Sequence, residues 1–254
     1  MKITFTGTGT SQGVPVIGCK CEVCTSNNEK DKRLRTSALI EVNGTKILID
    51  AGPDFRQQLL RENIDSLDAI LLTHEHKDHI GGLDDVRALN YITGKPVEIY
   101  AEQRVLNCVQ SEYPYAFVEN PYPGVPEMNL NAISEDKPFY INHIKIIPIR
   151  VFHHKLPILG FRINTTVYIT DANKIEEKEM EKIYGCETLI INALRKEEHL
   201  SHFTLNQALE ISLKSGAKQT FLTHLSHQMG LYSNLTNEIP GNVFIAYDGG
   251  SFEF

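Results

Sequence analysis

A dense group of metal-ligand side chains occupies six consecutive residues, His74-Glu75-His76-Lys77-Asp78-His79, and limits the folds open to this sequence. The apolar run 67–72 directly before it is typical of a buried strand, and a helical pattern spans about 83–91 after Gly81 and Gly82. The sequence therefore places the cluster on a loop between a strand and a helix. Rigid scaffolds present chemistry on such loops.

The spacing inside the cluster favours two metal ions. His74 and His76 are two residues apart in an extended segment, so their side chains point to the same side. The turn that follows directs Asp78 and His79 toward a second point nearby. A lone histidine at a strand end is usually a satisfied polar residue, and Asp78 alone could simply cap the next helix. Four ligand-type side chains at this spacing instead predict a dinuclear site.

This segment matches every specified position of the His-x-His-x-Asp-His signature of the metallo-β-lactamase superfamily, which the sequence resembles. The resemblance implies an α/β fold, the αββα sandwich, with two mixed sheets face to face and helices outside. The element order agrees, because each half of the chain has several strands followed by alternating helix and strand. There is no Pro/Gly/Ser-rich linker, low-complexity tract or short repeat, so residues 1–254 are predicted to form one domain.

Periodicity and turn signals predict the elements. Asn43-Gly44 is a strong hairpin signal between the strands on either side of it. Segment 112–129, rich in proline and tyrosine, is predicted to be an ordered surface loop or lid. Strands are expected at 2–7, 36–42, 46–49, 67–72, 97–100, 143–151, 160–164, 167–170, 188–192 and 219–222, with further short strands after 222, and helices at 55–63, 83–91, 103–111, 174–183 and 204–215.

Composition narrows the class of protein. Hydrophobic residues make up 41% and charged residues 22%, as in ordinary globular proteins, and no window approaches a membrane span. The N-terminus runs directly into a predicted strand, so we expect a cytoplasmic enzyme with no membrane partner. A net charge of −7 argues against a broad basic surface for nucleic acid and favours a small substrate.

Candidates for the remaining ligands lie at strand ends in the second half of the chain. A two-metal hydrolytic centre needs more ligands than one loop offers, ideally with a carboxylate that bridges both ions. His153, Asp171 and His224 each follow a predicted strand. The superfamily resemblance implies that His74, His76 and His153 bind one ion, that Asp78, His79 and His224 bind the other, and that Asp171 lies between them.

Two positions keep an alternative. His154 is adjacent to His153 and competes for its role, although the resemblance favours His153. Asp50 ends a strand, and we expect it to orient a ligand imidazole through the ring N–H that faces away from the metal. The other interpretation is that Asp50 only closes the turn before Pro53.

A second metal site is predicted from the cysteines. Cys19, Cys21 and Cys24 are too close for a simple disulfide framework, and in a reducing compartment such a cluster holds metal. A tetrahedral zinc ion requires four ligands, and His227 can complete the set if His224 points into the hydrolytic centre. Such a closed zinc would be structural.

The cysteine trio and the segments 7–15 and 222–227 resemble the cyclic-phosphate phosphodiesterases of bacterial phosphonate degradation, the PhnP-like branch. The resemblance implies that His202 is an active-site residue, either a general acid or a phosphate contact, with His199 as the alternative. Asp78 would serve catalysis through its metal. We therefore expect His202 and Asp78 to be the catalytic residues.

The leading hypothesis is a phosphodiesterase that hydrolyses a small cyclic phosphate ester, such as phosphoribosyl 1,2-cyclic phosphate, with two divalent ions, zinc or manganese, and one structural zinc. One alternative is a ribonuclease Z-like endonuclease, which should carry a protruding basic arm. Another is a non-catalytic or cofactor-handling protein like the B protein of pyrroloquinoline quinone biosynthesis. The resemblance also suggests a homodimer.

Overall fold

The computed structural model describes residues 1–253 and divides into two compact units. The first unit consists of Met1–Thr6, Ser37–Ser134 and Gly249–Phe254, and the second of Gly7–Thr36 and Glu135–Asp248. Each unit is built on one β-sheet. The expectation that the whole chain is one domain stays a prediction.

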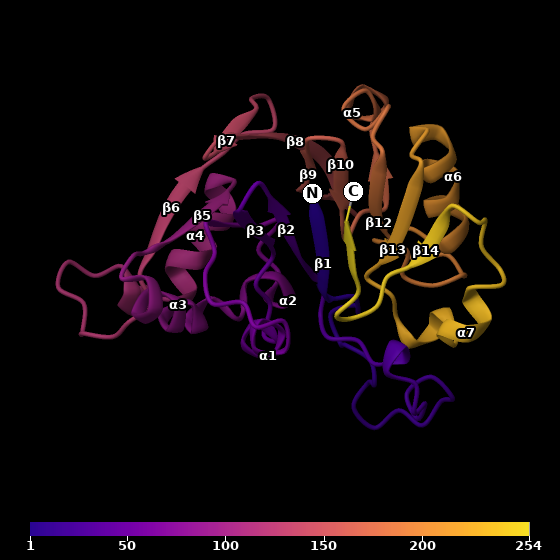
Figure 1. Ribbon diagram of the computed structural model, residues 1–254, viewed down its shortest axis with the longest axis horizontal. Helices are drawn as coiled ribbons and strands as arrows, with labels where there is room; N and C mark the ends of the chain where they lie inside the picture. Colours follow the sequence, from indigo (N-terminus) through magenta and orange to yellow (C-terminus); the bar gives the residue numbers. More distant parts are fainter. Residues whose placement is uncertain (254) are drawn as a thin grey trace. The chain divides into compact units, whose positions relative to one another are not determined.

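The first unit has a seven-stranded sheet in the order β15-β1-β2-β3-β4-β5-β6. Its strands are β1 Lys2–Gly7, β2 Ser37–Val42, β3 Thr45–Ile49, β4 Ala69–Leu71, β5 Val97–Ala101, β6 Met128–Ala132 and β15 Ser251–Glu253. The terminal strands β1 and β15 pair antiparallel and lie side by side (Figure 1). From β3 to β6 neighbouring strands are parallel, which requires crossover connections, and the helices lie in these.

The predicted hairpin is present. β2 and β3 pair antiparallel with Val42 opposite Thr45. Asn43 and Gly44 form the two-residue turn and both have positive φ, 49° and 84°. Such a turn matches the twist of the flanking strands, which explains the Asn-Gly pair.

Four helices cover one face of this sheet: α1 Phe55–Arg61, α2 Lys77–Ile80, α3 Val86–Thr93 and α4 Gln103–Glu112. Their apolar residues, among them Phe55, Ile80 and Val105, form one core cluster with Leu48 and Ile70 of the strands. α3 ends where Gly94 takes a left-handed conformation, φ 67°. The core holds the end of β4, and so the start of the histidine cluster, in a fixed place.

The second unit has an eight-stranded sheet in the order β11-β8-β9-β10-β12-β13-β14, with β7 paired to β8. Its strands are β7 Phe139–Ile141, β8 Ile144–His153, β9 Leu156–Ile163, β10 Thr166–Ile169, β11 Lys174–Ile175, β12 Thr188–Asn192, β13 Gln219–Thr223 and β14 Val243–Ile245. β8, β9 and β10 are antiparallel neighbours, while β10, β12, β13 and β14 run parallel. Both sheets are therefore mixed, as predicted.

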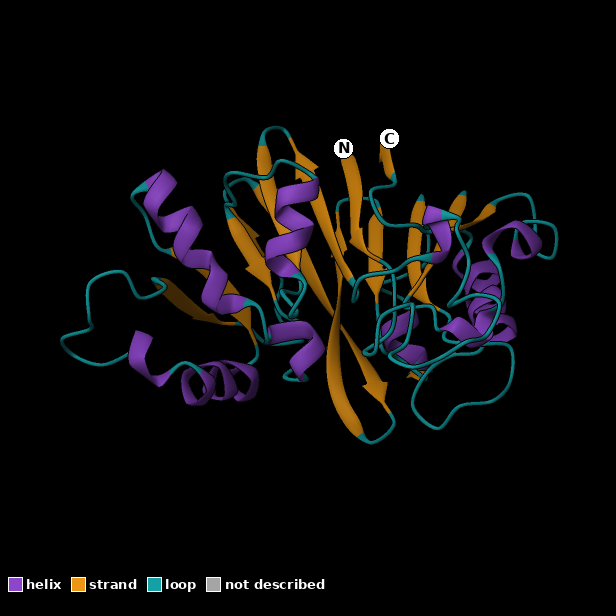
Figure 2. Cartoon of the chain, turned by 90° about the horizontal axis from the view of Figure 1, so that it is seen from below, coloured by secondary structure: helices purple, strands orange, loops and turns teal. Residues whose placement is uncertain are grey.

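The helices of this unit are α5 Glu177–Met180, α6 Leu205–Ser215 and α7 Tyr232–Leu235, labelled in Figure 1. Figure 2 shows helices in purple and strands in orange. Met180, Leu205 and Leu235 pack into a core cluster with strand residues such as Ile191 and Leu222. α6 starts with a capping box in which the Thr204 and Gln207 side chains each bond the other's backbone N–H. This cap fixes the end of the loop that carries His202.

Several predicted boundaries are wrong. Asp78 and His79 lie in α2, because the chain closes one helical turn directly after His76. The helix predicted at 174–183 is the short strand β11 followed by one turn, α5, because pairing with β8 overrides the local helix propensity. β9 starts at Leu156 and not at 160. The start was missed because Pro157 interrupts the strand pattern in the sequence. Strands β6 and β7 and helix α7 were not predicted.

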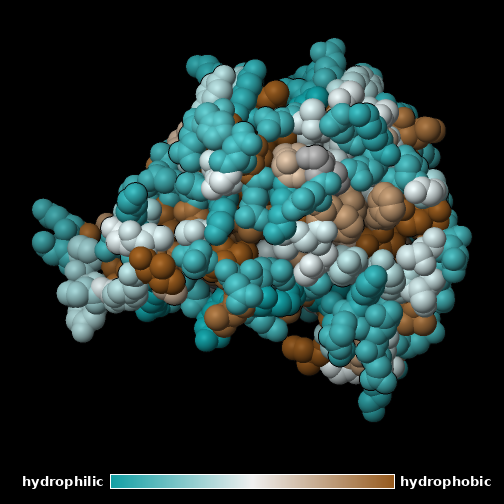
Figure 3. Space-filling model, viewed as in Figure 1, coloured by the Kyte–Doolittle hydropathy of each residue, from teal (hydrophilic) through white to brown (hydrophobic). Residues whose placement is uncertain are grey.

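The face seen in Figure 3 is dominated by hydrophilic residues, with apolar ones between them. Large apolar side chains that are exposed, such as Ile17 and Leu213, come from many different elements. Single exposed apolar residues are normal in globular proteins. Among residues 1–253, no helix is both long and apolar enough to cross a membrane.

Two glycines allow the turn after β3 to pack directly on α2. A Cβ on Gly52 would lie 2.0 Å from the carbonyl oxygen of Asp78, and one on Gly82 would lie 2.0 Å from the carbonyl oxygen of Gly52. The Ala51 N–H donates to the carbonyl oxygen of His79 at 2.7 Å. The backbone of the histidine cluster is therefore fixed from behind.

We expect Gly52→Ala to lower the free energy of unfolding by about 1–3 kcal/mol, because the added methyl group displaces the Asp78 backbone. Gly241→Ala is the control, since nothing lies within 4 Å of its Cβ position. Urea denaturation of both variants checks this. Equal stability of the two would show that the close packing at Gly52 is not required.

Candidate metal centre

The first unit gathers three imidazoles at the end of β4. The His74 and His76 ring centroids are 4.6 Å apart, and those of His74 and His79 are 4.2 Å apart. His74 and His79 are fully buried, while His76 is exposed. His74 Nε2 lies 3.0 Å from His76 Nδ1. The two histidines of the extended segment thus present ring nitrogens to one point, as the spacing predicts.

Asp50 organises this cluster from inside the core. One carboxylate oxygen accepts the Thr73 backbone N–H at 2.8 Å, and the other lies 2.9 Å from Thr73 Oγ1 and 2.7 Å from His79 Nδ1. Burial raises the pKa of Asp50, while His79 and the Thr73 donors oppose that rise. The φ of 62° at Asp50 also turns the chain after β3. That Asp50 orients a metal ligand stays a prediction.

The contact with Asp50 fixes the tautomer of His79. Nδ1 carries the hydrogen that Asp50 accepts, so Nε2 presents a lone pair. Nε2 lies 3.2 Å from Asp78 Oδ2. A lone pair facing a carboxylate oxygen is unfavourable unless a cation lies between them, so this arrangement fits a bound metal ion.

In the second unit, His153, at the end of β8, is likewise oriented by hydrogen bonds at Nδ1. Its Nδ1 lies 2.8 Å from the carbonyl oxygen of Asp171 and 3.0 Å from that of Ser201, so it donates and leaves Nε2 as the acceptor. His153, Asp171 and His202 each place a ligand atom within 4.8 Å of the others. His154, in contrast, is exposed and has a φ of 56° in the turn to β9.

His224 follows β13 and is buried. Its Nδ1 lies 3.0 Å from Thr36 Oγ1 and 3.0 Å from Asp171 Oδ1. Thr36 donates its hydroxyl hydrogen to the carbonyl oxygen of Gly9 at 2.6 Å, so it accepts from His224. Nε2 of His224 is therefore left as the acceptor nitrogen of the ring.

His202 lies among these rings. It stacks on His224 with centroids 4.8 Å apart and lies 4.7 Å from His153. Burial, with the neighbouring His224, lowers the pKa of His202 to about 3, so the ring is neutral at pH 7. Its Nδ1 is buried and has no hydrogen-bond partner within residues 1–253. A buried ring nitrogen with no protein partner can form a hydrogen bond to a ligand.

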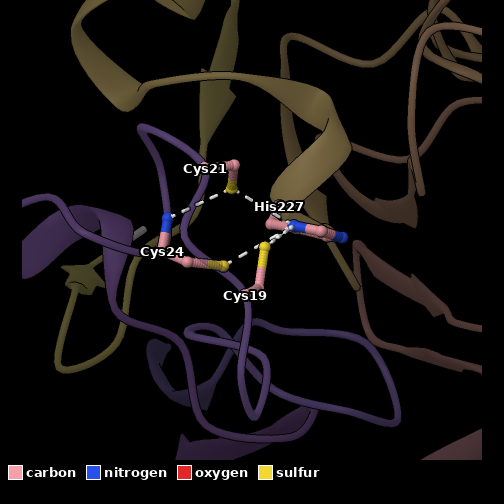
Figure 4. Close-up of side chains that lie close together, drawn as sticks. All are labelled: Cys19, Cys21, Cys24 and His227. Atoms are coloured by element: carbon pink, nitrogen blue, oxygen red, sulfur yellow. Dashed lines mark hydrogen bonds between the residues drawn. The ribbon is translucent and has the colours of Figure 1, made fainter.

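The three cysteines and His227 also come together (Figure 4). The Sγ atoms of Cys19, Cys21 and Cys24 lie 3.3, 3.3 and 3.5 Å from His227 Nδ1. In a zinc tetrahedron with usual bond lengths the sulfur-to-nitrogen edge is about 3.6 Å. The set therefore fits one tetrahedral ion closely.

The pKa values of these thiols differ. The Cys24 backbone N–H and His227 lower the pKa of Cys21 to about 6, whereas burial raises the pKa of Cys24 to about 11. A cation is what would make all three thiolates compatible at neutral pH. None of the five cysteines forms a disulfide.

The cysteine cluster is tied to the strand end that carries His224. Leu225 donates to the carbonyl oxygen of Thr8 at 2.9 Å and accepts from the Thr10 N–H at 3.1 Å. His224 and His227, three residues apart, therefore belong to different clusters, as the sequence suggested.

Three supporting residues were missed by sequence reasoning. Thr36 and Thr73 set the tautomers of His224 and the position of Asp50, and the carbonyl oxygen of Ser201 receives the His153 hydrogen. Thr73 had a signal, since it directly precedes His74. The other two are distant in sequence from the ligands they orient, so only the fold reveals them.

Known proteins share this architecture. The family model described as a beta-lactamase superfamily domain matches residues 45–225. The crystal structure of a new diphosphatase from the PhnP family is 37% identical, covers 100% of this chain and 97% of that one, and has a TM-score of 0.92. The predicted fold class, the αββα fold of metallo-β-lactamases, is confirmed.

Two curated relatives extend beyond this chain. An octanoyltransferase of Porphyromonas gingivalis (strain ATCC BAA-308 / W83) is 44% identical over 98% of this chain and 51% of its own length. A ribonuclease Z of Prochlorococcus marinus (strain MIT 9215) is 29% identical over 65% of this chain and 49% of its own length. The chain thus spans about half of each relative. From the family model and the full-length match to the diphosphatase, the chain belongs to the metallo-β-lactamase superfamily and, within it, to the PhnP-like branch.

Proposed function

We propose that this protein is a metal-dependent phosphodiesterase that hydrolyses a small phosphate ester, such as phosphoribosyl 1,2-cyclic phosphate. The observation that carries the proposal is the fixed tautomer of three imidazoles. His79, His153 and His224 each have an internal acceptor for the Nδ1 hydrogen, so each offers Nε2 to a metal. A family member that binds no metal would not need these ring orientations.

The ligands of the two units together would hold two divalent ions. His74, His76 and His153 would bind one ion, and Asp78, His79 and His224 the other, with Asp171 shared. Mixed histidine and carboxylate ligands accept zinc or manganese. When bound, such a pair supplies Lewis acidity and a water of lowered pKa.

The chain's own residues would handle the substrate. His202, neutral and buried, can donate a hydrogen bond to a phosphoryl oxygen, and an approaching anion would raise its pKa and let it protonate the leaving alkoxide. Asp78 takes part as a ligand beside His79. A net charge of −7 supports a small substrate over a polynucleotide.

Cys19, Cys21, Cys24 and His227 would hold one structural zinc. Four ligands close a tetrahedral ion and leave no position for substrate. The zinc would fix the N-terminal loop to the segment that follows His224.

A diphosphate ester is the second candidate substrate, because the PhnP-family relative is described as a diphosphatase. It requires the same attack at phosphorus. The ribonuclease Z alternative would be supported by steeply salt-dependent binding of transfer RNA. A B-protein-like scaffold would bind a single ion and hydrolyse nothing. Octanoyl transfer we assign to the part of the Porphyromonas protein that this chain does not match.

The activity test is hydrolysis of ribose cyclic phosphates and of bis(p-nitrophenyl) phosphate with zinc or manganese. We expect turnover with at least one of these metals. A metal-loaded protein inert toward every phosphodiester would refute the proposal. We further propose a cytoplasmic location and a homodimer, and sedimentation of the purified protein tests the dimer.

His153→Ala should lower kcat/KM on bis(p-nitrophenyl) phosphate by at least about 100-fold, as expected when a metal ligand is lost. His154→Ala is a matched control, because this neighbour is exposed in the turn. It should stay within about twofold of the unchanged protein. The reverse order of effects would make His154 the ligand.

Asp50→Asn should weaken metal binding by about 10–100-fold, because the amide cannot hold the His79 tautomer as the carboxylate does. Metal titration of the stripped protein measures this. Asp65→Asn, at an exposed aspartate of the same unit, should leave the affinity unchanged. An affinity equal to that of the unchanged protein would restrict Asp50 to its role in the turn.

Cys21→Ser should remove about one zinc per chain and lower the melting temperature, because the site loses one of its four ligands. Cys108→Ser is the control, since Cys108 lies on α4, outside the cluster. Elemental analysis and calorimetry give both readouts. Full zinc content in Cys21→Ser would contradict the Cys3His assignment.

A further inference from the structure

His199, in the second unit, has no role in the proposed metal centre. His199 lies three residues before His202 in the loop between β12 and α6, and it is half-buried. Its ring centroid is 5.1 Å from that of His202, with the planes tilted by 31°. His199 therefore extends the row of rings that starts at His224 and continues through His202.

The hydrogen bonds of His199 determine which ring nitrogen carries hydrogen. The Ser201 backbone N–H donates to His199 Nδ1 at 3.3 Å. A nitrogen that accepts from a backbone amide has no hydrogen of its own, so a neutral His199 carries its hydrogen on Nε2. His199 is thus a hydrogen-bond donor on the side away from Ser201.

The loop that carries His199 is held in place. The Arg195 guanidinium donates to the carbonyl oxygens of Glu197 at 3.3 Å and Glu198 at 2.7 Å, and to Gln228 Oε1 at 3.0 Å. From the other side, Ser201 accepts from His153 Nδ1. A donor fixed in this way costs little entropy when it binds a ligand.

We infer that His199 is a specificity residue that donates from Nε2 to a second anionic group of the substrate, the neighbouring phosphoryl group of a diphosphate ester. This inference rests on the proposed phosphodiesterase function. When one phosphoryl group of a diphosphate meets His202, the outer oxygens of the next phosphoryl group, linked through one bridging oxygen, would come within reach of the neighbouring His199 ring. A substrate with a single phosphorus has no group for His199.

The test compares substrates with one and two phosphorus atoms. We expect His199→Ala to lower kcat/KM on diadenosine diphosphate about tenfold, mainly through KM, as for a lost hydrogen bond to a charged group. The loss on bis(p-nitrophenyl) phosphate should be about threefold at most. His199→Gln should recover part of the difference, because its amide N–H lies near the position of Nε2. Leu200→Ala, at an exposed neighbour, is the control.

Inhibition gives a second readout that does not depend on turnover of the diphosphate. Against bis(p-nitrophenyl) phosphate, His199→Ala should raise the inhibition constant of pyrophosphate about tenfold and leave that of inorganic phosphate nearly unchanged. Equal losses on both substrates, or no change for pyrophosphate, would overturn the role of His199. So would an unchanged protein that hydrolyses bis(p-nitrophenyl) phosphate but not the diphosphate. If the unchanged protein hydrolyses neither, the proposed function itself fails, and this inference with it.

Discussion

The candidate metal centre depends on one repeated interaction, the hydrogen bond that a ligand histidine donates from Nδ1 to an internal acceptor. The acceptor is a carboxylate for His79, two backbone carbonyl oxygens for His153, and the Thr36 hydroxyl together with an Asp171 carboxylate oxygen for His224. Each bond fixes the ring plane and leaves Nε2 with a lone pair. Without these bonds the rings could take either tautomer and would not form a prepared ligand set.

A left-handed backbone conformation occurs at several residues of the candidate metal centre. Asp50, Asp171 and His224 each lie one or two residues after the end of a strand, and their φ angles are 62°, 57° and 56°. Residues other than glycine rarely adopt this left-handed conformation, and it costs free energy that the surrounding core must supply. Buried strands hold each side chain at the point where the chain turns away. The stability of each sheet therefore keeps the candidate ligands in position.

The sequence allowed the fold and the ligand candidates to be predicted because both depend on local signals. Buried strands are apolar runs, Asn43-Gly44 is a turn pair, and His74 to His79 form a compact motif. Elements that depend on tertiary pairing were not predicted. β11 forms only because it pairs with β8, and Pro157 interrupts the sequence pattern at the start of β9. The acceptors behind the ligands escaped for the same reason, since Thr36 lies 188 residues from His224. The position of His199 beside His202 became meaningful only with the rings in place.

A crystal structure of the metal-loaded protein, with anomalous scattering at the zinc and manganese edges, tests this ligand arrangement. We expect three ions per chain, two bound through Nε2 of His79, His153 and His224 with their partners, and one held by Cys19, Cys21, Cys24 and His227. A single ion at the histidines under saturating metal, or coordination through Nδ1 of His79, His153 or His224, would contradict it.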